Sequence, residues 1–281
     1  MNKQDEDSLV ISGEPIFYLQ ALSPEFKNLK LAPISDVHFG NPLFSERHLD
    51  RTLEFIAGND NVYTILNGDL CEAVIKSSKG EIYNQKVTPQ GQRDWIIKKF
   101  TPIKHKILGS TMGNHELRIW NEVGIDICKD IAEALEIPYR AAGIMIKVTF
   151  GDGNKGVKGR PYSYFIEATH GYGGARTKSA KAVKVERLAN WIHADVYFMS
   201  HDHVVNVAPD VYLMPDNRTH LDKKTGFTVG KVKECRKMLV KTNAYLKWGG
   251  YSEMGGFPPT DLATPTVTLA GEGKPRVSVE I

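Results

Sequence analysis

Short apolar runs alternate with amphipathic segments along the first half of the chain. Val62–Leu66 is a largely apolar run of strand length, whereas Leu49, Leu53 and Ile56 recur at the spacing of one helix face. Serine, threonine, proline and glycine stand where helices would begin or end. The pattern predicts strands at Leu29–Ile34, Val62–Leu66 and Lys106–Ser110, and helices at 45–58, 88–100 and 125–135.

The second half of the chain is richer in strand patterns. One amphipathic segment, Ser179–Ile192, predicts a helix, and the segments 151–160 and 216–225 are polar and read as loops. No segment has the composition of a linker, so we expect one domain over residues 1–281, with a β-rich C-terminal part at 204–281. The expected strands are Ile144–Phe150, Tyr162–Thr169, Ala194–Met199, Met238–Thr242, Thr266–Leu269 and Val277–Ile281.

Five of the predicted strands end in polar clusters that contain aspartate, asparagine or histidine. In α/β sheets the carboxyl ends of strands share an edge, where ligand sites gather. One such cluster would be an ordinary turn or a surface histidine, but five in succession are hard to explain structurally. The clusters are Asp36-Val-His38, Gly68-Asp69, Gly113-Asn114-His115-Glu116, His170-Gly171 and His201-Asp-His203.

Imidazole and hard oxygen donors together suit first-row divalent ions better than calcium, which prefers an all-oxygen shell. Because side chains alternate along a strand, Asp36 and His38 are expected to point the same way and bind one ion. His201 and His203 would do likewise, or would divide between two ions at a bend. The two oxygens of Asp69 allow it to bridge both ions. Manganese is favoured, with iron, zinc and nickel as alternatives.

The order of these motifs resembles that of the calcineurin-like metallophosphoesterases, over residues 36 to 203. The resemblance implies a four-layer α/β sandwich of two mixed sheets flanked by helices. It implies one ion held by Asp36, His38, Asp69 and His203, and a second by Asp69, Asn114, His170 and His201. His115 would then contact the phosphate and protonate the leaving oxygen, with Glu72 as its acidic partner and Glu116 as a structural residue.

The resemblance also implies a phosphate-ester substrate, and we favour a diester of nucleic acid or a nucleotide. Ala73 stands where related protein phosphatases carry an arginine that grips a monoester. A phosphomonoesterase remains the alternative enzyme, and a non-catalytic subunit that binds metal and nucleic acid is the alternative of another class. Arg118, Arg176 and Lys178 are candidate substrate contacts. A solvated helix face explains the basic residues of segment 176–187 equally well; these are Arg176, Lys178, Lys181, Lys184 and Arg187.

Composition and charge indicate the compartment and the classes of partner, but they do not identify the activity. The formal net charge of +3 permits a polyanionic substrate without requiring one. Three scattered cysteines indicate neither a disulfide framework nor a cysteine zinc site. No apolar run approaches membrane-spanning length, and the N-terminal residues lack the core of a signal peptide. We therefore expect a cytoplasmic protein with no membrane partner, and the sequence leaves its oligomeric state open.

Overall fold

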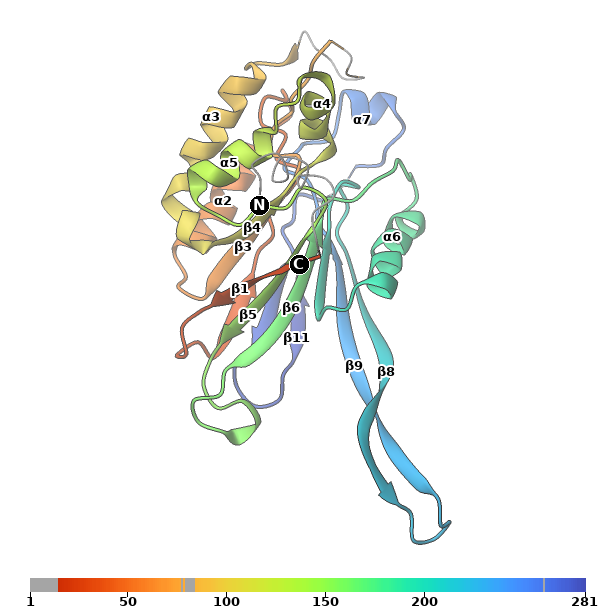
Figure 1. The fold of residues 1–281 in the computed structure, drawn as a ribbon. Coiled ribbons are helices and arrows are strands. Elements are labelled where there is room, and N and C mark those ends of the chain that lie inside the picture. The colour runs from red at the N-terminus through yellow and green to blue at the C-terminus, as the bar shows by residue number, and fades with distance from the viewer. Residues whose placement is uncertain (1–14, 77, 79–83, 260) are drawn as a thin grey trace.

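Two mixed β-sheets form the centre of the protein, whose computed structural model describes residues 15–76, 78, 84–259 and 261–281 (Figure 1). The six-stranded sheet has the order β1 (Phe17–Ala21), β5 (Ile144–Phe150), β6 (Tyr162–Thr169), β7 (Val196–Met199), β9 (Thr228–Lys241) and β8 (Asn206–Leu221). The five-stranded sheet has the order β11 (Val277–Glu280), β10 (Thr266–Ala270), β2 (Asn28–Leu31), β3 (Val62–Asn67) and β4 (Ile107–Thr111).

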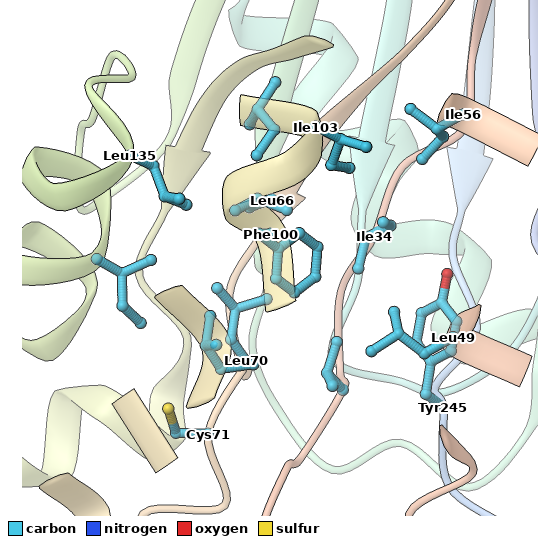
Figure 2. Close-up of a cluster of buried hydrophobic side chains, with 14 of the residues drawn as sticks. Ile34, Leu49, Ile56, Leu66, Leu70, Cys71, Phe100, Ile103, Leu135 and Tyr245 are labelled. Carbon is cyan, nitrogen blue, oxygen red and sulfur yellow. The ribbon is translucent and has the colours of Figure 1, made fainter. Parts of the chain in front are cut away.

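The hydrophobic core divides into layers that follow these sheets. Leu31 and Ile65 of one sheet pack with residues such as Ile146 of the other, so the sheets lie face to face. The outer face of the five-stranded sheet is covered by α2 (Glu46–Ala57), α3 (Pro89–Phe100) and α5 (Ile127–Leu135), whose buried side chains appear in Figure 2. Helix α6 (Lys178–Trp191) covers the outer face of the six-stranded sheet through Val185 and Ala189. This is the four-layer α/β sandwich that was predicted.

The helices begin where the sequence signals place them. Thr88 caps α3 by accepting a hydrogen bond from the Gly91 N–H, and Thr177 caps α6 through the Ala180 N–H. Ser45 occupies the cap position of α2 without a side-chain bond, and Gly58 ends that helix. Helices predicted at 45–58, 88–100, 125–135 and 179–192 are therefore all present.

Several elements differ from the prediction. Helix α4 (Asn114–Val123), the short helix α7 (Tyr251–Met254) and strand β1 were not predicted. Two 3₁₀ turns, η2 (Thr101–Lys106) and η3 (Asn154–Gly156), were also not foreseen. The loop expected at 216–225 is partly wrong: β8 continues to Leu221 and pairs with β9, and only residues 222–225 of the expected loop lie in the turn that joins the two strands. The two strands form an arm that projects beyond the rest of the sheet (Figure 1).

The strand directions bring the polar clusters to one edge of the sandwich. β2, β3 and β4 run parallel, as do β6, β7 and β9, so the carboxyl ends of β3, β4, β6 and β7 precede the predicted ligands. No helix in the described ranges is both long and apolar enough to cross a membrane.

Candidate metal centre

The segment after β2 places Asp36 and His38 through backbone bonds to the loop after β3. The Asp36 N–H donates to Gly68 O at 3.0 Å, and the His38 N–H donates to Asp69 O at 3.0 Å. Both residues have left-handed backbones, with φ of 49° and 50°. Their shared direction therefore comes from turns after the strand, not from alternation along a strand as the sequence suggested.

Left-handed conformations recur among the predicted ligands. Asp69, His201 and His203 have φ of 50°, 71° and 49°, which non-glycine residues rarely adopt. Such a residue costs about 1–3 kcal/mol and persists only where its surroundings enforce it. Backbone strain of this kind clusters at functional sites. Five of the eight described non-glycine residues with positive φ are predicted ligands.

One group of donors combines the first and last motifs. His203 Nε2 lies 3.2 Å from Asp36 Oδ1 and 3.3 Å from His38 Nε2. His38 Nε2 lies 3.9 Å from Asp36 Oδ1 and 3.8 Å from Asp69 Oδ2. Donor atoms of Asp36, His38 and His203 therefore lie close enough to share one ion.

A second group forms around the other side of Asp69. His170 Nε2 lies 3.1 Å from Asp69 Oδ2 and 3.1 Å from Asn114 Oδ1, and His201 Nδ1 lies 2.6 Å from the same Asn114 oxygen. Asp69, His170 and His201 meet the same proximity criterion for one ion. A third group combines His38, Asp69 and His115, so six of the seven predicted ligands fall in donor groups linked through His38 and Asp69, and Asn114 contacts two of the histidines.

The remaining ring nitrogens are anchored by oxygens outside these groups. His170 Nδ1 lies 2.9 Å from Asn67 O, His201 Nε2 lies 2.5 Å from Gly173 O, and His38 Nδ1 lies 3.0 Å from Glu72 Oε2. A neutral histidine that donates from this nitrogen turns the lone pair of its other nitrogen toward the site, as metal ligands do.

Facing lone pairs require a positive charge between them. Asp36 Oδ1 is buried and receives no hydrogen bond from the described residues, although His203 Nε2 is 3.2 Å away. Burial lowers the pKa of His38 and His170, but nearby carboxylates outweigh it and raise these pKa values to about 9 and about 10. The carboxylates therefore favour positive charge at the site, which protonated histidines or a divalent cation would supply. The residues fit a metal centre.

His115 lies beside both groups at the start of α4. Its N–H donates to Asp69 Oδ1 at 2.8 Å, and its Nδ1 is 2.7 Å from the backbone oxygen of Glu72. Burial lowers its pKa to about 4, with a further contribution from the charges of His38 and Arg118. The Glu72 carboxylate, the predicted partner of His115, lies 3.8 Å from His115 Nδ1, within ion-pair distance, and 3.0 Å from His38 Nδ1. Glu72 thus orients His38 through its side chain and His115 through its backbone.

Glu116 holds the loop that carries Asp69. Its two carboxylate oxygens accept hydrogen bonds from the Asp69 and Cys71 N–H groups, at 3.1 and 2.8 Å. Burial and the charge of Asp69 raise the pKa of Glu116 to about 7. Gly113 permits this arrangement, because a Cβ there would lie 2.1 Å from Asp69 N and Oδ1. The structural role expected for Glu116 is the one observed.

Two supporting residues were missed in the sequence. Asn67 joins the strand ends, since its amide donates to Thr169 O and Ser200 Oγ at 2.8 and 2.6 Å. Asp202, between two predicted ligands, lies against three buried lysines: Lys184 at 2.7 Å, Lys241 at 2.5 Å and, through its backbone oxygen, Lys181 at 2.8 Å. The only signal for Asp202 was its place inside the His-Asp-His motif.

The basic segment 176–187 is therefore neither a uniform solvated face nor a uniform phosphate-binding face. Lys181 and Lys184 are buried on Asp202, whereas Arg176 and Lys178 are exposed. A cavity of about 940 Å³ opens over the centre, with Asp69, His115 and Arg118 in its lining. Arg118 thus faces the cavity, Arg176 lies over the ring of the lining residue Phe257, and Lys178 is not among the lining residues.

Comparison with known proteins gives similarities among solved structures only. No family model and no curated protein matches the chain. The phosphoesterase YfcE from E. coli is 13% identical (86% of this chain and 88% of that chain, TM-score 0.38). Vacuolar protein sorting 29 from Cryptosporidium parvum is 12% identical; the match covers 90% of this chain and 97% of that chain, with a TM-score of 0.39. The nuclease MPE from Pseudomonas putida is 12% identical; the match covers 89% of this chain and 87% of that chain, with a TM-score of 0.34.

Proposed function

We propose that the protein is a metal-dependent phosphoesterase that hydrolyses phosphodiester bonds of nucleic acids or nucleotides. The proposal rests on the convergence of the predicted ligands, six of which fall in donor groups linked through His38 and Asp69, and on a buried Asp36 oxygen that receives no hydrogen bond from the described residues. We infer two divalent ions, manganese favoured, with iron, zinc or nickel as alternatives. The buried Cys71 and Cys128, both free thiols, suit a reducing compartment such as the cytoplasm.

The donor groups assign residues to each ion. Asp36, His38 and His203 would hold one, and Asn114, His170 and His201 the other, with Asp69 contributing to both. Bound divalent ions would make a water molecule more acidic and would polarise the phosphate oxygens. Asn114 contributes an uncharged oxygen, which limits the negative charge that an anionic substrate meets.

His115 is placed to protonate the leaving oxygen. Its Nδ1 is held by Glu72 O, so Nε2 is the nitrogen that can carry a proton toward substrate. A pKa of about 4 leaves the free imidazole neutral at pH 7. A phosphate anion beside it favours the imidazolium by charge attraction and raises that pKa. Protonation of His115 would thus accompany substrate binding, and it would matter most for esters with poor leaving groups.

A diester is favoured because the position that carries an arginine in related protein phosphatases is occupied here by Ala73, which is buried. Ala73 is fully buried with φ of 47°, and its N–H donates to Gln92 Oε1 at 2.9 Å, so no side chain there reaches the cavity. Arg118 in the cavity lining is the observation that favours the alternative, a phosphomonoesterase, because guanidinium groups bind terminal phosphates well.

The test compares bis(p-nitrophenyl) phosphate with p-nitrophenyl phosphate, after metal stripping and addition of Mn²⁺. Labelled single- and double-stranded DNA would be incubated in parallel. We expect Mn²⁺-dependent cleavage of the diester and of DNA, with loss of activity in Asp69→Ala and in His115→Ala. Preference for the monoester would favour the phosphatase alternative. Protein that binds Mn²⁺ and cleaves none of these substrates would contradict catalysis and favour the non-catalytic nucleic-acid-binding alternative.

A further inference from the structure

The cavity over the metal centre is larger than a phosphate requires. Its volume of about 940 Å³ matches sites for ligands of drug size. The lining includes donors of the metal centre such as Asp69, and segments 41–45 and 245–258 add an apolar side made of Leu43, Leu246, Trp248 and Phe257, with the polar Asn41 and Lys247 beside them. Phosphate chemistry uses none of these side chains, so the apolar side is available to another part of the substrate.

Backbone hydrogen bonds hold this apolar side of the cavity, called the wall here, in place. The Lys247 N–H donates to Leu43 O at 2.9 Å and the Ser45 N–H donates to Tyr245 O at 2.8 Å, which joins two segments far apart in sequence. Tyr245 itself is buried in the core beneath the wall, so it is not a surface aromatic (Figure 2). The wall therefore packs on the same hydrophobic core as the loops that carry the predicted ligands.

Trp248 lines the cavity from this wall. Its indole Nε1–H donates to Phe257 O at 2.8 Å, which fixes the ring and satisfies its only polar group. The side chain is nevertheless 46% exposed, unlike a tryptophan that fills a core. Arg176 lies over the Phe257 ring, 5.6 Å from its centroid, and adds a cation at the rim. A planar ring with an anionic phosphate attached is the ligand that such a wall fits.

We propose that Trp248 and Phe257 form a nucleobase subsite, which stacks the base of the nucleotide whose phosphate occupies the metal centre. The proposal rests on the proposed function and specifies its substrate class as nucleoside phosphodiesters. Stacking on aromatic faces tolerates every base, so the subsite would select nucleotides over simple phosphate esters without selecting a sequence. Leu43 contributes apolar contact at the base of the wall.

Two esters with the same leaving group test the proposal. Thymidine 5′-(p-nitrophenyl phosphate) and methyl p-nitrophenyl phosphate differ only in the group that would occupy the subsite. We expect Trp248→Ala to lower kcat/KM for the thymidine ester by about 5- to 150-fold, the factor for one stacked base. The methyl ester should change less than about twofold, a shift well below that stacking factor. Trp248→Phe should retain most of the preference, and Trp191→Ala, which removes a 78% exposed tryptophan outside the lining, should behave as wild type.

Binding without turnover separates the subsite from the proposed function. Thymidine 5′-monophosphate should quench tryptophan fluorescence of the metal-free protein, and Trp248→Ala should abolish that change. If quenching depends on Trp248 but neither ester is hydrolysed, the subsite stands and the proposed function fails. If both esters are hydrolysed and Trp248→Ala lowers kcat/KM equally for both, the function stands and the subsite is overturned. The same conclusion follows if Trp248→Ala changes kcat/KM for neither ester.

Discussion

Asp202→Asn should destabilise the protein more than substitution of any exposed acid on the same face. The Asp202 carboxylate is buried between the ammonium groups of Lys184 and Lys241, at 2.7 and 2.5 Å, while Lys181 donates to its backbone oxygen. One negative charge thus offsets part of three positive charges in a buried cluster. Asparagine keeps the shape of the side chain but leaves the lysines without a counter-charge.

The expected loss follows from the cost of an uncompensated buried charge. Removal of one partner of a buried ion pair typically costs about 3–5 kcal/mol, against a total stability of about 5–15 kcal/mol. We expect a loss of about that size for Asp202→Asn in urea unfolding followed by circular dichroism. Addition of Lys241→Met should recover part of the loss, because the second change removes a charge that the first left unpaired.

Measurements in EDTA keep metal binding out of this comparison. Glu186→Gln, an exposed acid on α6, is the matched control and should unfold near the wild-type urea concentration. The reasoning is refuted if Asp202→Asn costs less than about 1 kcal/mol, the range of exposed ion pairs. It is also refuted if the losses of Asp202→Asn and Lys241→Met simply add.

Three further predictions test other parts of the site and the core. Gly113→Ala should lose metal binding, measured by calorimetric titration with Mn²⁺, because its Cβ would collide with Asp69; Gly174→Ala, which has open space, should bind as wild type. Glu72→Gln should weaken Mn²⁺ binding about 10- to 100-fold through His38, and unchanged affinity would contradict that role. Burial, against the charge of Arg140, raises the pKa of Glu167 to about 7 from 4.5, so its contribution to stability is full below about pH 4.5 and is lost as pH rises to 7. Glu167→Gln should therefore match wild type in urea unfolding at pH 4.5 and exceed it by about 3 kcal/mol at pH 8, whereas equal stability at both pH values would contradict the shift.

The apolar runs and the ligand motifs were readable in the sequence because each depends on local pattern. Strand β3 is buried on both faces, so Val62–Leu66 appears as an apolar run interrupted only by Thr64. Helix α4 was missed because its inward face carries Glu116, a charged residue buried for its hydrogen bonds to the Asp69 loop. The helical period is therefore interrupted where the site needs an acid.

The arm and the ligand conformations depend on contacts that sequence patterns do not record. Pro209 and Pro215 argue against a strand, yet both lie in β8, which is the edge of its sheet, where a missing N–H costs little. The left-handed backbones of Asp36 and His38 have no glycine signal. Alternation along a strand therefore predicted the right neighbours for the wrong geometric reason.

Buried polar residues stabilise the strained loops that carry the predicted ligands. Left-handed backbones at five ligands, at about 1–3 kcal/mol each, would together rival the stability of a whole domain. Three buried polar residues offset that cost: Asn67 bonds to Ser200, Glu116 bonds to the loop that carries Asp69, and Asp202 bonds to Lys241 at the end of β9. The edge where the two sheets meet is therefore polar for a structural reason as well as a chemical one. Removal of these supports should disorganise the ligands before it unfolds the layers, because the hydrophobic clusters between the sheets and helices do not include them.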